Sequence, residues 1–199
     1  MRLTCERLAI GFVFLLLATA AQAQTYTANL TGAAENPAVS PAGTGTTAVT
    51  YSASAHTLRV QIVFSGLTSA TSASHIHCCI AAPGNAGVAT TLPSFTGFPL
   101  GVQSGSMDQT YDLTNATSWN PAFVTANGGT TAGAEAALAA ALATSQAYLN
   151  IHTANNPGGE IRGFMAVGVP AVPVWMLAVG ALLTLAVAYV ALRKRLQTA

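Results

Sequence analysis

Apolar and polar residues alternate along much of the middle of this chain. Between residues 57 and 65, the apolar side chains Leu58, Val60, Ile62 and Phe64 occupy every second position. A β-strand places such residues on one face of a sheet. Further runs with strand-like alternation or composition cover residues 26–30, 44–54, 74–80, 100–113, 148–153 and 160–167. Short strands separated by turns predict a mainly β domain, either an antiparallel β-sandwich or a flattened barrel.

Two local signals refine this prediction. Residues 155–159, Asn-Asn-Pro-Gly-Gly, are turn-favouring and are expected to join the last two strands as a hairpin. Residues 133–145 are rich in Ala and Leu. They predict one short Ala-rich helix, capped at its start by Thr130 or Thr131. We expect a single domain over residues 24–168.

The N-terminal end has the pattern of a secretory signal peptide. Arg2 and Arg7 precede an apolar run over residues 8–20, and Ala21-Gln22-Ala23 follows as a small-residue cleavage pattern. We therefore expect residues 1–23 to direct export and to be removed after Ala23. An uncleaved membrane anchor is the alternative, although the apolar run is shorter than a membrane span.

The C-terminal end predicts a transmembrane helix. Residues 174–192 carry no charge over 19 positions, and Arg193, Lys194 and Arg195 follow directly. About 20 apolar residues cross a bilayer, and basic residues stay on the cytoplasmic side. The pattern therefore predicts a domain outside the membrane and a cytoplasmic C-terminus. A buried helix of a soluble domain is the alternative.

A short motif precedes this helix, within residues 169–199. Val169 and Pro170, then Pro173 and Trp175, resemble the IPTL-CTERM and PEP-CTERM sorting signals of Gram-negative bacteria. That resemblance implies a bacterial origin and a sorting protease of the exosortase type as a partner. The two prolines would keep the junction extended, as processing requires. A proline-containing stem before a permanent anchor is the alternative.

The charge of the central part excludes one class of partner. Residues 24–168 contain two arginines, five acidic residues and no lysine, a formal net charge of −3. Nucleic-acid binding needs a basic face that neutralises phosphates. We therefore expect no nucleic-acid partner.

Two segments hold most of the chemistry-bearing side chains: residues 74–79, Ser-His-Ile-His-Cys-Cys, and residues 148–163, which run from Tyr-Leu-Asn-Ile-His-Thr to Gly-Glu-Ile-Arg-Gly. They resemble the two signature segments of the CHRD domain, the module repeated in chordin and found singly in bacterial secreted proteins. The resemblance covers residues 25–166 and implies a β fold. It also implies a non-enzymatic exported module that contacts an extracellular protein or matrix.

The histidines suggest a metal site. His75 and His77 are two positions apart on a predicted strand, so their side chains share a face. If His152 and Glu160 lie on a neighbouring strand, the four side chains could bind copper or zinc. Such a site resembles that of copper–zinc superoxide dismutase in its His-x-His strand, but no catalytic triad or phosphate loop accompanies it. We predict no enzymatic activity.

The alternative interpretation is a buried polar cluster without a metal. In this interpretation the same histidines and Glu160 pair with three further residues, Asn150, Thr153 and Arg162, because buried polar groups need partners. The cluster would then clamp the ends of the two signature strands together. His56, in a short turn, is expected to be exposed and without a partner.

Cys78 and Cys79 are the only cysteines left after removal of residues 1–23. In an oxidising compartment they are candidates for a disulfide between neighbouring residues. Free thiols, thiolate metal ligands and bridges to another molecule are the alternatives.

Overall fold

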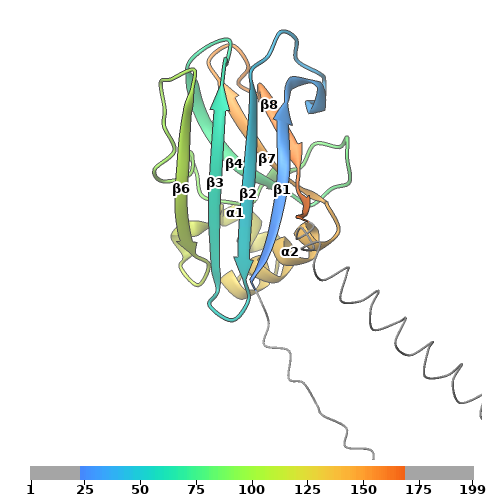
Figure 1. The fold of residues 1–199 in the computed structure, drawn as a ribbon. Helices are drawn as coiled ribbons and strands as arrows, with labels where there is room; N and C mark the ends of the chain where they lie inside the picture. The colour runs from blue at the N-terminus through green and yellow to red at the C-terminus, as the bar shows by residue number, and fades with distance from the viewer. Residues whose placement is uncertain (1–22, 169–199) are drawn as a thin grey trace, which may run out of the picture. The chain divides into compact units, whose positions relative to one another are not determined.

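The computed structural model describes residues 23–168, which form a curled antiparallel sheet closed at one end by two α-helices (Figure 1). The strands are β1 (Gln24–Thr31), β2 (Thr44–Ser52), β3 (Thr57–Ser65), β4 (Thr71–Cys78), β5 (Gly87–Val88), β6 (Gly105–Asp112), β7 (Ala147–Thr153), β8 (Ile161–Phe164) and β9 (Ala166–Val167). The helices are α1 (Pro121–Ala126) and α2 (Thr131–Ala143), with 3₁₀ turns η1 (Gly32–Ala34) and η2 (Ala116–Ser118).

All nine strands belong to one sheet, in the order β5-β4-β7-β8-β1-β2-β3-β6, with β9 beside β1. Figure 1 shows β1, β2, β3 and β6 in front of β4, β7 and β8. The mainly β, antiparallel prediction is confirmed, but the two layers are one continuous half-barrel and not two separate sheets. The halves join where β1 meets β8 at Thr31 and Arg162 and meets β9 at two further positions.

The core lies between the two halves of the sheet. The four alternating residues of β3 singled out in the sequence are at most 2% exposed. They face apolar side chains of β4 and β7, among them Ile76, Leu149 and Ile151, which are fully buried. The hydrophobic effect acting on these inner faces therefore fixes which residues of each strand point outwards.

The predicted helix is confirmed. Thr130 caps α2 by accepting a hydrogen bond from the backbone N–H of Gly133 at 3.0 Å. Ala134, Leu138 and Leu142 of α2 are buried in the core. The shorter helix α1, capped by Asn120, was not predicted, because six residues are too few for a helical periodicity.

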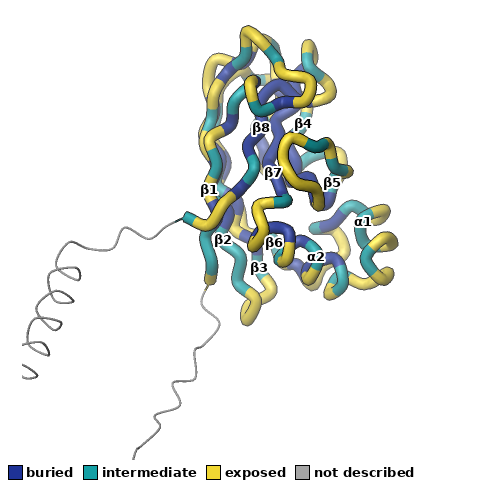
Figure 2. The backbone as a smooth tube through the Cα atoms, turned by 90° about the vertical axis from the view of Figure 1, so that its right-hand side faces the viewer, coloured by how far each residue is buried: buried dark blue, intermediate teal, exposed yellow. Residues whose placement is uncertain are grey.

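β7 is buried along its whole length, on both faces (Figure 2). One face of β7 contacts the apolar core, and loops cover the other. A buried outer face lined by polar residues is unusual for a strand of an antiparallel sheet, whose second face commonly meets solvent.

The predicted signal peptide and the predicted sorting motif, membrane helix and basic tail lie outside the described residues, apart from Ala23. Within residues 23–168, no helix is both long and apolar enough to cross a membrane. The predictions for the two ends of the chain stay predictions.

Candidate metal centre

The outer face of β4, β7 and β8 carries three of the four histidines of the chain. His75 and His77 alternate with core residues of β4, and His152 does so on β7. In the register of this pair, His75 lies opposite Asn150 and His77 opposite Tyr148, while Ala73 lies opposite His152. The strand alternation therefore turns the rings of His75 and His77 to the same face, as predicted, and the pairing of β4 with β7 adds the ring of His152 to that face.

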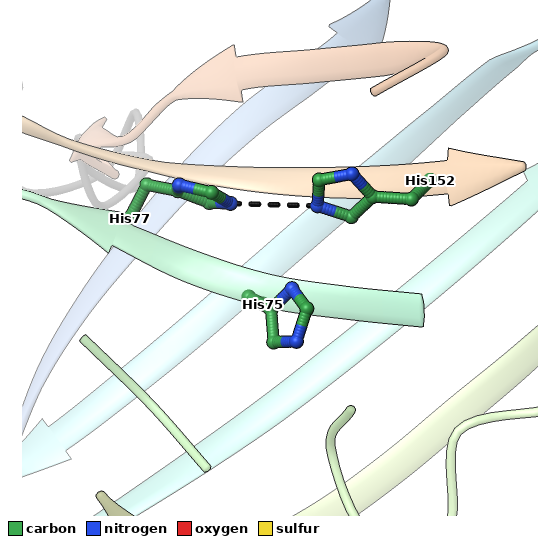
Figure 3. Close-up of side chains that lie close together, drawn as sticks. All are labelled: His75, His77 and His152. Atoms are coloured by element: carbon green, nitrogen blue, oxygen red, sulfur yellow. Dashed lines mark hydrogen bonds between the residues drawn. The ribbon is translucent and has the colours of Figure 1, made fainter. Parts of the chain in front are cut away.

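The three rings converge on one point. One nitrogen of each ring lies within 4.8 Å of one nitrogen of the other two, and all three residues are buried. Nε2 of His77 and Nε2 of His152 lie 3.4 Å apart, and Figure 3 shows them facing each other beside the His75 ring. Two imidazole nitrogens bound to one tetrahedral zinc ion at about 2.0–2.1 Å are also about 3.4 Å apart.

Backbone carbonyls fix the tautomer of each ring. Nδ1 of His77 lies 2.9 Å from the carbonyl oxygen of Ala86, and Nδ1 of His152 lies 3.0 Å from that of Pro157. For His75 the equivalent contact is from Nε2 to the carbonyl of Pro93, at 2.7 Å. A carbonyl oxygen only accepts, so each of these nitrogens carries the proton.

The second nitrogen of each neutral ring is consequently an acceptor with a free lone pair. Nδ1 of His75 is buried and has no hydrogen-bond partner. The Nε2 atoms of His77 and His152 face only each other, acceptor to acceptor. A metal-binding histidine is typically held in this way, with one nitrogen on the metal and the other donating to a carbonyl.

Burial keeps the three rings neutral. Desolvation lowers the pKa of His75 to about 4, although the bond to Pro93 opposes the shift. Desolvation also lowers the pKa of His77 to about 4, and the neighbouring histidines and Arg162 lower it further. Desolvation by burial also lowers the pKa of His152. At neutral pH the cluster is therefore in the form that binds a metal ion.

Glu160 does not join the histidines, so the predicted set of three imidazoles and a carboxylate is wrong. Its carboxylate accepts hydrogen bonds from the backbone of Gly43 and Thr68, from the hydroxyls of Thr68 and Thr153, and from the amide of Asn156. These five bonds span 2.7 to 3.3 Å. They outweigh desolvation, which acts in the opposite direction, and leave the pKa of Glu160 lowered.

Arg162 forms a third, separate cluster. It is 1% exposed and donates to the carbonyls of Ala34, Pro83 and Gly84 and to the side chain of Asn85. The predicted single clamp of His152, Glu160 and Arg162 is therefore wrong, because each of the three side chains has its own partners. Arg162 therefore links strand β8 to two segments, the one that precedes β2 and the one that precedes β5.

The family comparison agrees with the two segments that build these clusters. The family model described as the CHRD domain matches residues 26–165. This chain belongs to the CHRD domain family. No curated protein and no solved structure matches the chain.

Two glycines of the second signature segment shape this CHRD domain. Gly159 has a φ of +126°, and a Cβ there would overlap the side chain of Asn150. A Cβ on Gly163 would overlap the backbone oxygen of Asn29 on β1. The first glycine turns the chain just before Glu160, so strand alternation does not extend from Arg162 back to Glu160. The second glycine lets β8 approach β1 closely.

The remaining predicted residues have local roles. Asn150 is 2% exposed, donates weakly to the carbonyl of Gly158 at 3.5 Å, and has an unpartnered Oδ1. Thr153 bonds Glu160. Cys78 and Cys79 form a disulfide bond, with Cys78 buried in the core and Cys79 exposed.

The exposed position expected for His56 is confirmed, but the expectation that it has no partner is wrong. His56 is half exposed, but its Nδ1 lies 2.9 Å from a carboxylate oxygen of Glu135 in α2. The two residues are 79 positions apart in the sequence. Alternation and composition carry no signal for such a contact.

Sequence reasoning missed Tyr148 and Glu35. The ring of Tyr148 stacks on that of His77, with centroids 4.9 Å apart and planes 7° apart, and the guanidinium carbon of Arg162 lies 4.7 Å from the Tyr148 centroid. Glu35 is 8% exposed and lies 3.7 Å from Arg162. Desolvation raises the pKa of Glu35 to about 7, while the charge of Arg162 opposes the shift.

Proposed function

We propose that this CHRD domain is a non-enzymatic exported module that binds one transition-metal ion through His75, His77 and His152. The observation that carries the proposal is the group of three lone pairs, all buried and all without a donor. Leaving a buried acceptor unpaired costs free energy, and three acceptors facing one another add mutual repulsion. A bound cation would remove both costs at once.

The alternative, a polar cluster that only holds strands together, explains this geometry less well. A structural cluster pairs donors with acceptors, as the carboxylate of Glu160 does. The histidines instead direct their donor nitrogens outwards to carbonyls of covering loops. Imidazole nitrogens suit zinc, copper, iron and nickel ions.

Metal analysis of the purified full-length protein in a mild detergent tests the proposal. After dialysis against a metal mixture, we expect one ion per chain, measured by plasma mass spectrometry. The ion should be lost in His77→Gln and in His152→Gln. The matched control His56→Gln, at the histidine paired with Glu135, should retain it. Absence of stoichiometric metal, or retention in both cluster variants, would contradict the proposal.

The location of the domain is a separate proposal, supported by the sequence of the two ends. Residues 1–23 would direct export, and the segment from Val174 to the basic triplet at 193–195 would anchor the domain outside the cytoplasmic membrane. An exosortase-like protease would be the partner at the motif that contains Pro170 and Pro173. Protease added to spheroplasts should digest the domain and leave a small C-terminal fragment. A domain protected until lysis would contradict this orientation.

A further inference from the structure

The charge of the proposed ligand set limits which ion the site can hold. Each of the three rings keeps one N–H, which donates a hydrogen bond to a carbonyl, and would bind an ion through the lone pair of its other nitrogen, so each ligand is a neutral imidazole. Among residues 23–168, no carboxylate or free thiol joins the three histidines in a group that could share an ion. The whole charge of a bound ion would therefore stay uncompensated by its ligands.

The nearby charged groups add no compensation. Glu160 is saturated by its own donors, and both cysteines are in a disulfide. The ring of Tyr148 stacks on His77, and the buried guanidinium of Arg162 stacks on the other partner of this pair, Tyr148. The charged group closest to the histidines in this stack is therefore a cation, which cannot compensate the charge of a bound metal ion. Glu35 lies against Arg162 and not against the histidines.

Uncompensated charge makes a divalent ion more costly to bury than a monovalent ion. The cost of burying an ion rises with the square of its charge, so a divalent ion costs about four times as much as a monovalent ion. The 3.4 Å separation of the two Nε2 atoms also suits trigonal or tetrahedral coordination. Adjacent corners of a square-planar copper(II) site would be about 2.9 Å apart, and opposite corners about 4.1 Å.

Resting on the proposed function, we infer that the three-histidine site selects a monovalent d¹⁰ ion, copper(I), over zinc(II) and copper(II). Three neutral imidazoles complete a trigonal copper(I) site without an anionic ligand. Zinc(II) or copper(II) would keep its second positive charge uncompensated unless an anion, such as hydroxide or chloride, joined the site.

Competition titrations of the purified full-length protein test this selectivity. Copper(I), held reduced by ascorbate without oxygen or thiols, is titrated against a copper(I) chelator, and zinc(II) against a zinc chelator. We expect copper(I) to bind about 100-fold more tightly than zinc(II), or better, because of the difference in buried charge. Equal affinities, or tighter binding of zinc(II) at the same histidines, would overturn the inference and leave the proposed function intact.

A charge variant isolates the cause. Asn150 lies opposite His75 in the strand register and is buried with a free Oδ1. Asn150→Asp therefore adds a carboxylate of nearly the same shape beside the site. It should lower the copper(I)-to-zinc(II) affinity ratio by about 10-fold or more, because the new charge attracts a divalent ion twice as strongly.

The matched control is Gln109→Glu, the same charge change at an exposed position of β6, which should leave the ratio unchanged. An unchanged ratio in Asn150→Asp would overturn the charge argument. Failure of both ions to bind, or binding that survives His77→Gln, would instead overturn the proposed function itself.

Discussion

The histidine cluster and the Glu160 cluster both involve β7 and its hairpin to β8, yet their polar atoms are satisfied in opposite ways. Glu160 accepts five hydrogen bonds from three segments of the chain. The N–H group of each histidine donates to a backbone carbonyl, and the three remaining acceptor nitrogens face each other. A buried carboxylate with all its hydrogen-bond partners is typical of a group that stabilises the fold, whereas converging free lone pairs are typical of a binding site.

The largest expected effect is on the structural side of this comparison. Glu160→Gln replaces an acceptor-only carboxylate by an amide whose NH₂ group must face donors of Gly43, Thr68 or Thr153. Breaking a buried charged network of this kind costs about 3–5 kcal/mol of unfolding free energy. We expect the melting midpoint of the metal-free protein to fall by about 6–15 °C in calorimetry.

The same variant should keep its metal. If Glu160 is only structural, copper(I) affinity measured below the lowered midpoint stays within a few-fold of the parent protein. Loss of metal in Glu160→Gln with an unchanged melting midpoint would contradict the structural role given to Glu160 and would make it part of the metal site.

The next effect is the stabilisation of the binding site by its ion. An ion at 100 times its dissociation constant stabilises the folded state by about 2.7 kcal/mol. The melting midpoint of the parent protein should therefore rise by about 5–10 °C when copper(I) is added. His77→Gln should show no rise, and a chelator should abolish the rise in the parent. An equal rise in both proteins would place the ion elsewhere.

Much of this comparison was predictable from the sequence, because it depends on local alternation. The spacing of His75 and His77 put both rings on one face, and the turn residues at 155–159 indicated the hairpin that brings in β8. Capping by Thr130 was equally local. In each case the determining physics acts within a few residues of the chain.

The separation of the clusters was not predictable, because it depends on contacts distant in sequence. Glu160 bonds Gly43 across 117 positions, and Arg162 bonds Ala34 across 128. The partners of the histidines are backbone carbonyls at Ala86, Pro93 and Pro157. Every residue has such a carbonyl, so no residue type marks these positions.

A smaller effect is expected at Glu35 and depends on pH. Its folded pKa is about 7, above the unfolded value of about 4.5, so its contribution to stability is full below pH 4.5 and is lost as the pH rises through 7. Glu35→Gln has no such titration. Relative to this variant, the free energy of unfolding of the parent should fall by on the order of 2 kcal/mol between pH 4.5 and 8, measured by urea unfolding. A pH-independent difference would mean that the pKa of Glu35 is the same in the folded and unfolded states.

The smallest effect is expected at the fourth histidine, which tests whether burial distinguishes the binding site. His56 is half exposed, and its bond to Glu135 is open to solvent on the histidine side. Exposed ion pairs contribute about 0–1 kcal/mol, so His56→Ala should lower the melting midpoint by less than about 4 °C. The copper(I) affinity of His56→Ala should equal that of the parent. His56 lies in the turn between β2 and β3, its Nδ1 is paired with the carboxylate of Glu135 on α2, and within residues 23–168 no second imidazole is near enough to share an ion with it. A drop in affinity in this variant, with His77→Gln still binding, would move the metal site from the buried cluster to the surface.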